Sequence, residues 1–421
     1  MILHIDIDCF FASAHRIDNP KLTNIPIAVG GRSNLNIFDR KNQKRKISCI
    51  DGAFTSSILS SNDDKTFEEY FKDKDGRVRG IITTSSYEAR AFGVKTAMSV
   101  AEALRHCPHL TVIPPNYPLY HELSHKLKLL LEKEVPSIEQ FSIDEFFCDV
   151  TGWIQDRDIV DFAKKLKQKI IDQIGLPVSI GIANTKWIAK LATNDAKPYG
   201  IKLVPKEEVE SFIKDIPIEK FPGIGEGYFQ KLCGRGIKTL GDVKERKELF
   251  YSFGKNGIQL YNRINGIDNE KIQLSNGKKS IGLGRTFDNE NDRDEIKRRI
   301  TILARHITFL AYKGKHSPLT YSLHIRYQYG EKSHDFINTN RLFNEHYFKQ
   351  ELLRLFAKID THPSHAIIQI NITISNFSEN KYTTLDLLSY EEDTKNAKLT
   401  DSMQKLRNKF GIDIIKSGGE L

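Results

Sequence analysis

The most constraining feature of this sequence is the alternation of short strand-like segments with amphipathic segments of helical spacing. Residues 2–8 alternate in hydropathy and predict a half-buried strand. The polar face of this strand would carry His4, Asp6 and Asp8. Strand-like and helix-like segments continue to residue 204, so we expect an α+β or α/β core in which helices cover one face of a sheet.

Breaks in this pattern divide the chain, as its 421 residues would require. A polar and charged stretch at about 32–79 is predicted to be a surface insertion with one short helix near 65–71. It has few large apolar side chains, so we expect it to bury little surface. The remaining parts are short helices broken by glycines at 205–271, a basic connector at 272–280, a second unit with helices and alternating strands at 281–377, and a helical tail at 378–421.

Charge and composition limit the classes of function. Lys and Arg total 63 against 54 Asp and Glu, which gives a net charge of +9 and favours a polyanionic partner. The five cysteines form no C-x-x-C pair, so a structural zinc site is not expected. No apolar stretch reaches the roughly 18–20 residues of a membrane span, and the acidic start does not resemble a signal peptide. These features predict a cytoplasmic protein without a membrane partner.

Carboxylates occur in two strand-like segments. Asp6 and Asp8 end the first, and Asp144 and Glu145 lie within EQFSIDEFFCDV. Grouped carboxylates are costly in a core unless a hard cation such as Mg²⁺ compensates them. The alternative is that each acid merely ends its strand at the surface. Since neighbouring side chains on a strand point to opposite faces, Asp144 and Glu145 can converge only at a turn or bulge.

Five motifs occur in an order that resembles the Y-family DNA polymerases, nearest the DinB/UmuC group. They are DIDCFFAS, SSYEARAFGVKTAM, FSIDEFFCDV, VSIGIANTKWIAKLATNDAKPYG and FPGIGEGYFQKLCGRGIKTLGDV. The resemblance runs from Met1 to about residue 377, apart from the insertion. It implies a multidomain α+β fold of the right-hand polymerase type: a palm (1–10 and 116–204), fingers (11–115), a thumb with a helix-hairpin-helix (205–271), a linker (272–280), a little finger (281–377) and a tail (378–421).

The resemblance also implies an activity, a cofactor and a set of site residues. The activity is template-directed addition of deoxynucleotides to a primer 3′ end, in translesion synthesis and DNA repair. The cofactor is a pair of Mg²⁺ ions, replaceable by Mn²⁺. The implied metal ligands are Asp6, Asp144, Glu145 and the backbone carbonyl of Ile7, whereas Asp8 is not expected to contact the metal.

Nucleotide contacts are implied in the same way. Phe11 matches a steric gate that excludes the ribose 2′-hydroxyl, whereas Phe10 is divided between nucleotide contact and core packing. Thr84, Tyr87, Arg90 and Lys197 match residues that contact the incoming triphosphate. Arg and Tyr suit this role because a guanidinium binds phosphate through two hydrogen bonds and a hydroxyl donates one.

The implied partners are primer-template DNA and deoxynucleotides, bound by a monomer. PGIGEG follows no strand, so it lacks the context of a dinucleotide-binding motif. Its Gly223 and Gly225 instead resemble a hairpin that grips phosphates, with a plain helix turn as the alternative. Further phosphate contacts are expected from Lys278, Lys279 and Arg285. A degenerate sliding-clamp motif is at Leu385–Leu388, without the usual Gln and Phe.

Two other functions remain open at this point. A two-metal nuclease would use the same acids, but it has no use for Phe11, Tyr87 or Arg90 in this arrangement. A catalytically inactive DNA-binding accessory protein of the same fold would not need the full set of acids. For the insertion, the basic run from Arg40 to Lys46 suggests a non-specific contact with template DNA, and a passive surface loop is the alternative.

Overall fold

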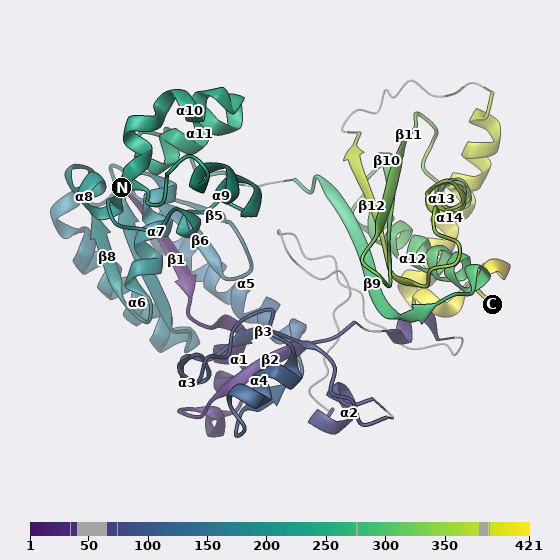
Figure 1. The fold of residues 1–421 in the computed structure, drawn as a ribbon, viewed down its shortest axis with the longest axis horizontal. Helices are drawn as coiled ribbons and strands as arrows, with labels where there is room; N and C mark the ends of the chain where they lie inside the picture. Colours follow the sequence, from purple (N-terminus) through teal and green to yellow (C-terminus); the bar gives the residue numbers. More distant parts are fainter. Residues whose placement is uncertain (34, 40–64, 74, 275–276, 379–385, 387) are drawn as a thin grey trace. The chain divides into compact units, whose positions relative to one another are not determined.

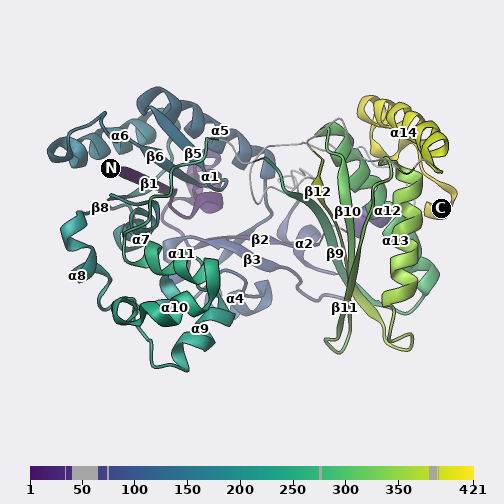
Figure 2. The same cartoon turned by 90° about the horizontal axis from the view of Figure 1, so that it is seen from above.

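The computed structural model describes residues 1–33, 35–39, 65–73, 75–274, 277–378, 386 and 388–421, which form two compact units (Figures 1 and 2). The first unit comprises residues 1–31 and most of the chain up to 276. The second comprises 277–421 together with the start of the insertion, 32–39. The finer division into palm, fingers, thumb and little finger stays a prediction.

A five-stranded sheet forms the centre of the first unit, in the order β5-β6-β1-β7-β8. β1 is antiparallel to both of its neighbours, and β7 and β8 are parallel. The segment EQFSIDEFFCDV is not one strand, because it forms the hairpin of β5 and β6. The strands are β1 (Ile2–Ile7), β5 (Ser137–Gln140), β6 (Glu145–Asp149), β7 (Val178–Ala183) and β8 (Ile201–Val204).

Helices cover this sheet on both faces, so the prediction of one covered face was wrong. Leu3, Ile5 and Ile7 of β1 share a core with helices α5 (Tyr117–Glu134) and α6 (Ile159–Ile174). Helix α7 (Lys186–Ala196) packs on β7 and β1 from the other face. Every residue of β1 is buried, which corrects the half-buried strand that alternation predicted. Alternation misled because the polar side chains His4 and Asp6 are themselves covered.

The close approach of α7 depends on one glycine. A Cβ built on Gly181 of β7 would lie 2.1 Å from the carbonyl oxygen of Ala189 and 2.3 Å from the backbone nitrogen of Thr193. Any side chain at Gly181 would therefore push α7 away from the sheet. Since α7 leads directly to Lys197, this close packing also fixes one side of the site.

A smaller sheet and several helices complete the part of the first unit before residue 116. The sheet order is β3-β2-β4, with β2 antiparallel to β3 and parallel to β4. The predicted short helix of the insertion is confirmed as α2, where Phe71 is fully buried against Gly30 and Gly80. The elements are α1 (Phe10–Asp18), β2 (Ile27–Gly31), α2 (Phe67–Phe71), β3 (Ile81–Ser85), α3 (Tyr87–Ala91), α4 (Val100–His106) and β4 (Thr111–Ile113).

Short helices follow β8, as the glycine-broken pattern predicted. Their apolar residues share one core with α7 and with Phe147 of the central sheet. The helices are α8 (Val209–Ile213), α9 (Glu226–Cys233), α10 (Lys247–Ser252) and α11 (Gly254–Ile264).

The second unit is an antiparallel sheet with helices on one face. The strand order is β11-β10-β12-β9, so β9 is an edge strand. Alternate residues of β10, such as Leu323 and Ile325, are buried against the helices, and those between them form a polar face. The elements are β9 (Ser280–Glu290), α12 (Arg293–Lys313), β10 (Pro318–Tyr327), β11 (Lys332–Asn338), α13 (Glu345–Ile359), β12 (Ile367–Phe377) and α14 (Tyr390–Phe410).

The predicted helical tail is part of this second unit. Helix α14 packs against α13 and α12, and the residues after it turn back so that Glu420 is buried beside α12. The start of the insertion also lies here, because Ile37 and Phe38 are buried in the same core as α12 and β9. The prediction that the insertion contributes little to a core was therefore wrong for these two residues and for Phe71. Its basic run, Arg40 to Lys46, lies outside the described residues.

Candidate active site

The predicted metal ligands are brought together where β1 ends beside the start of β6. Asp6 lies opposite Glu145 in the antiparallel register. The backbone N–H of Ile7 donates a hydrogen bond of 3.0 Å to the carbonyl oxygen of Asp144. Asp6, Asp144 and Glu145 therefore lie at the same end of the central sheet, although Asp6 is far from the other two in the sequence.

A bend explains how two adjacent acids can serve one site. The backbone N–H groups of Phe141 and Ser142 both donate to the carbonyl oxygen of Glu145, at 3.0 and 3.3 Å. This tight turn leaves Asp144 outside β6, which begins at Glu145, so strand alternation does not separate the two side chains. The hydroxyl of Ser142 donates to Asp144 Oδ1 at 2.5 Å and orients this carboxylate.

Burial makes this acid cluster electrostatically unfavourable. Burial raises the pKa of Asp6, Glu145 and Asp144 raise it further, and Lys197 only partly offsets these effects, so that the pKa is about 7. The pKa of Asp144 is also raised, mainly by burial. Carboxylates whose pKa is raised in this way are typical of functional sites.

Two lysines supply the positive charge that the acids face. Lys197 Nζ lies 2.7 Å from Asp6 Oδ1, and Lys190 of α7 forms an ion pair with Glu145. As they stand, no three carboxylate, imidazole or thiolate side chains in the described part of the chain are gathered closely enough to hold a metal ion. The donor set nevertheless fits a hard divalent cation, because it offers carboxylate oxygens whose charge the two lysines only partly offset.

Asp8 is hydrogen-bonded to residues around the site and is not part of the acid cluster. It is fully buried and accepts hydrogen bonds from the hydroxyl of Tyr87, the hydroxyl of Ser179 (2.7 Å) and the backbone N–H of Tyr199 (3.3 Å). These partners belong to α3, β7 and the turn after Lys197. Asp8 therefore joins the elements that carry the predicted phosphate contacts.

Tyr87 and Arg90 lie on one face of the short helix α3. The guanidinium of Arg90 lies over the ring of Tyr87, 5.1 Å from its centroid, and donates to the carbonyl oxygen of Ser85 at 3.1 Å. Burial and the hydrogen bond to Asp8 raise the pKa of Tyr87, so its hydroxyl stays a donor. Thr84 is half-buried at the end of β3, next to this helix.

The two phenylalanines differ in their surroundings. Phe11 is only partly buried, and its ring is stacked on that of Tyr120 with centroids 4.1 Å apart. Phe10 is 2% exposed and belongs to the core around β1. This favours core packing for Phe10, while Phe11 is a partly exposed ring held against Tyr120.

The predicted DNA contacts fall in both units. In the first, Gly223 has a φ of 98°, and Cβ atoms built on Gly223 and Gly225 would meet open space just before α9. In the second, Lys278 and Lys279 precede β9 and Arg285 lies on it. Of the predicted clamp motif, Leu385 and Leu387 lie outside the described residues, and Leu388 is 99% exposed.

Sequence reasoning missed several residues of this site. Lys190 was not expected to pair with Glu145, and Tyr199 was not expected to donate to Asp8. His4 is fully buried with its Nε2 3.9 Å from Glu145, and burial lowers the pKa of its ring. One signal was available for Lys190, because it lies on the helix that leads to Lys197.

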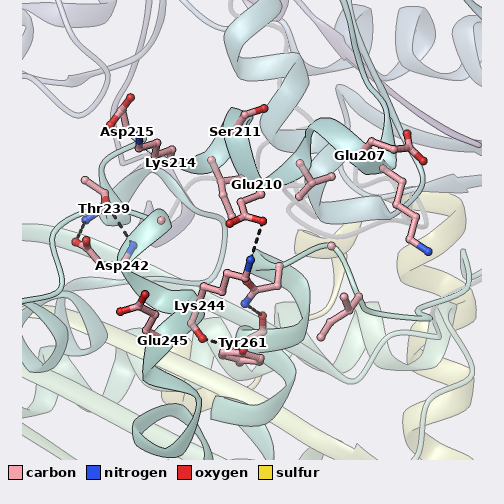
Figure 3. Close-up of a pocket in the computed structure, with 17 residues that line it drawn as sticks. Glu207, Glu210, Ser211, Lys214, Asp215, Thr239, Asp242, Lys244, Glu245 and Tyr261 are labelled. Atoms are coloured by element: carbon pink, nitrogen blue, oxygen red, sulfur yellow. Dashed lines mark hydrogen bonds and ion pairs between the residues drawn. The ribbon is translucent and has the colours of Figure 1, made fainter.

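A separate cavity of about 1050 Å³ lies in the first unit, away from the acids (Figure 3). Residues between Lys206 and Asp215 line it together with Thr239, Lys244 and Tyr261. Lys244 bridges the lining through an ion pair of 2.7 Å with Glu210. None of the predicted site residues lines this cavity.

Among the helices of the described residues, none is long and apolar enough to cross a membrane.

Comparisons with known proteins identify the family of this chain. The model of the impB/mucB/samB family matches residues 5–194, and that of its C-terminal domain matches residues 278–387. DNA polymerase IV of Oceanobacillus iheyensis is 31% identical, over 99% of this chain and 91% of its own length. DNA polymerase IV 1 of Bacillus subtilis is 29% identical, over 100% of this chain and 93% of its own.

Solved structures show the same fold. A chimera of the Y-family DNA polymerases Dbh and Dpo4 has a TM-score of 0.69 at 20% identity, covering 90% of this chain and 99% of the chimera. An insertion ternary complex of Dbh DNA polymerase has a TM-score of 0.57 at 22% identity, with the same coverage.

The family matches and the DNA polymerase IV relatives place this multidomain chain among the nucleotidyl-transferring enzymes. Within that class, the chain belongs to the Y family of translesion DNA polymerases, in its DinB-type branch, and is a DNA-directed DNA polymerase. Members of this family generally depend on divalent metal ions. The alternative of an inactive accessory protein gains no support.

Proposed function

We propose that this polymerase extends a DNA primer through the site formed by Asp6, Asp144 and Glu145. The observation that carries the proposal is the register that sets Asp6 opposite Glu145, with Asp144 in the bend beside them. These three carboxylates and the carbonyl oxygen of Ile7 would hold two Mg²⁺ ions. When bound, such ions activate the attacking hydroxyl and neutralise charge on the leaving pyrophosphate.

The nucleotide would be bound by the residues around Asp8. Tyr87 and Arg90 present a hydroxyl and a guanidinium from one helix, and both suit phosphate oxygens. Lys197 pairs with Asp6 in the present arrangement, so its ammonium is close enough to exchange this carboxylate for a triphosphate. Phe11 would exclude a 2′-hydroxyl because its ring is held by Tyr120.

Primer-template DNA would be held through its backbone. The open glycine hairpin before α9 lets backbone N–H groups approach a phosphate. On the polar face of the second unit's sheet, β10 presents His324 and Arg326, and Lys332 of β11 lies opposite Arg326. Because such contacts read no bases, we expect binding to be independent of sequence. We further propose that the protein acts as a cytoplasmic monomer and that Asp386 and Leu388 belong to a clamp-binding segment.

Primer extension tests the activity. Purified protein incubated with primed template, Mg²⁺ and deoxynucleotides should lengthen the primer, and omission of the metal should stop this. A primer that shortens would instead establish a nuclease, and an unchanged primer would leave only DNA binding.

The DNA-binding part is tested by salt dependence. Replacing Lys278 and Lys279 by Ala should lower the slope of log affinity against log salt by roughly 0.9 for each phosphate that is no longer neutralised. The matched control is Lys398→Ala, at an exposed position on α14. An affinity that does not respond to salt in the unmodified protein would contradict the proposal.

A further inference from the structure

The insertion begins with a segment that is built into the second unit. Strand β2 ends at Gly31, and Leu35–Phe38 then form a 3₁₀ turn, here called the anchor segment. Ile37 is 3% exposed and Phe38 7% exposed, and Leu35 packs against the same core. In Figure 1 this turn is the dark purple element beside the base of β9 and α12.

Specific interactions hold Phe38 in place. Its ring meets that of Phe287 edge to face, with centroids 6.2 Å apart. The guanidinium of Arg299 lies over both rings, 5.2 Å from Phe38 and 4.4 Å from Phe287. Arg298 donates a hydrogen bond of 2.8 Å to the carbonyl oxygen of Phe38. The ring is thus enclosed by aromatic and cationic groups of β9 and α12, and its backbone is bonded as well.

The residues that form this seat are themselves fixed. Arg299 is paired with Glu290 at 3.0 Å and with Glu295 at 2.7 Å. Glu295 also pairs with Arg298 at 2.7 Å. Since these ion pairs join β9 to the first turns of α12, the seat is part of the second unit's own framework. The segment before the anchor adds to this attachment, because Ser33 Oγ accepts from the backbone N–H of Thr286 on β9 at 3.3 Å.

The anchor follows β2 by only a few residues, so it can limit the motion of the second unit. The second unit is already joined to the first by the connector at 272–280. The anchor adds another connection, because the chain runs on from β2 to a segment that is bound non-covalently to β9 and α12. The chain from Gly31 to Leu35 spans at most roughly 15 Å when fully extended. A connection this short limits how far β9 and α12 can move from β2.

We propose that the anchor segment tethers the second unit to β2 and thereby restrains its motion while the enzyme holds DNA. With the tether, the conformational entropy of positioning the second unit is lost on folding. It is then not lost again each time that both units bind the same duplex. It therefore raises the effective concentration of the second unit at the DNA. The electrostatic contact predicted for Arg40 to Lys46 stays a separate prediction.

The first experiment tests whether the anchor is seated in solution. Phe38→Asp places a charge among apolar rings and should release the segment. Backbone hydrogen exchange in β9 and the first turns of α12 should then become faster. The matched control is Phe410→Asp, the same change at a ring of the same unit that is 56% exposed, which should leave that exchange unaltered. Unaltered exchange in Phe38→Asp would overturn the proposal.

The second experiment separates tethering from packing. Ten Gly/Ser residues inserted between Arg32 and Ser33 should leave the anchor seated, with unaltered exchange in α12, but make the connection slack. Spin labels at Gln173→Cys in the first unit and Asn408→Cys in the second, with Cys49 and Cys233 replaced by Ser, report the distance between the units. The distance distribution should broaden in the lengthened protein. An unaltered distribution would overturn the proposal, because the short connection would then restrain nothing.

The consequence for DNA is measured on the same lengthened protein. Dissociation from primed DNA should become roughly three- to tenfold faster, while the rate of the first insertion from bound DNA stays the same. Only this last measurement rests on the proposed function. Failure of the unmodified protein to extend primers would reject that function and leave the distance measurement valid, whereas unaltered dissociation with a broadened distribution would reject the role on DNA.

Discussion

Two clusters of buried charge, one in each unit, show opposite electrostatic states. In the first unit, Asp6 and Asp144 have raised pKa values, and the pKa of Asp6 reaches about 7 although Lys197 is beside it. In the second unit, burial alone would raise the pKa of Glu345, but Lys349 and Arg407 together lower it to about 2. Both clusters are buried, so burial does not distinguish them.

The carboxylates of the second cluster are paired with cations of the same chain. Arg407 of α14 pairs with Glu345 of α13, and Lys349 bridges Glu345 and Glu420 at 2.7 Å each. Arg305 of α12 then pairs with Glu420 at 2.6 Å. Every carboxylate in this chain of ion pairs has a cationic partner within the protein. These ion pairs fasten the tail to the two helices of the second unit.

The difference lies in what completes each cluster. The network of the second unit is complete within the chain, so it contributes to the fold. The acids of the first unit keep an unfavourable charge that two lysines only partly offset, so they are suited to a cationic ligand from solution. The first cluster should therefore be needed for activity and not for stability, and the second for stability and not for chemistry.

The largest expected effect is on catalysis. Asp144→Ala should lower the rate of primer extension by at least about 10³-fold, because it removes a ligand of the ions that stabilise the transition state. Its melting temperature should change little, because burial disfavours the charged form of this carboxylate. The control is Asp149→Ala, at the other end of β6, which should extend primers normally. An Asp144→Ala protein with near-normal extension would reject the proposed site.

The next effect is on stability. Arg407→Met removes a partner of Glu345 and leaves a buried carboxylate undercompensated, which should lower the free energy of unfolding by about 3 kcal/mol. Urea unfolding followed by circular dichroism measures this. Lys405→Met breaks an exposed ion pair with Asp401 on the same helix and should cost less than about 0.5 kcal/mol. Equal losses in the two variants would mean that the buried network gives no special stability.

The pH dependence of stability should follow the lowered pKa of Glu345. A carboxyl with a folded pKa of about 2 and an ordinary value of 4.5 stabilises the fold above pH 4.5. That contribution is lost as the pH falls toward 2, and roughly 2 kcal/mol of it should be gone at pH 3. Unfolding of the unmodified protein and of Glu345→Gln at pH 6 and pH 3 isolates it. If both proteins lose the same stability, Glu345 is not the titrating group.

The smallest effect concerns an uncharged residue of the first site. Phe11→Ala should raise the use of ribonucleotides relative to deoxynucleotides by at least about tenfold, or roughly 1.4 kcal/mol, because the ring acts by steric exclusion. Single-nucleotide insertion kinetics measure this ratio. Phe92→Ala, at an exposed ring after α3, is the control and should leave selectivity as it was. Unaltered selectivity in Phe11→Ala would move the gate to another residue.

The sequence by itself determined the order and type of most elements. Hydrophobic periodicity is a local property, so it identified the helices at α5, α6, α12 and α13 and the strands at β1, β7, β10 and β12. The motifs also predicted the three acids, of which the strand register sets Asp6 opposite Glu145, while the N–H of Ile7 donates to the carbonyl oxygen of Asp144. Periodicity could not show that β1 is covered on both faces, because a buried polar residue looks the same in a sequence as an exposed one.

Only the tertiary structure decided which distant residues meet. The bend that turns Asp144 toward Asp6 depends on hydrogen bonds to Glu145, and the pairing of Lys190 with Glu145 depends on how α7 crosses the sheet. The anchor is the clearest case. A polar insertion between two strands of the first unit contains Ile37 and Phe38, and nothing in its local pattern indicates that their core lies in the second unit. Interactions between residues far apart in the chain fix such choices, because burial is a property of the whole fold.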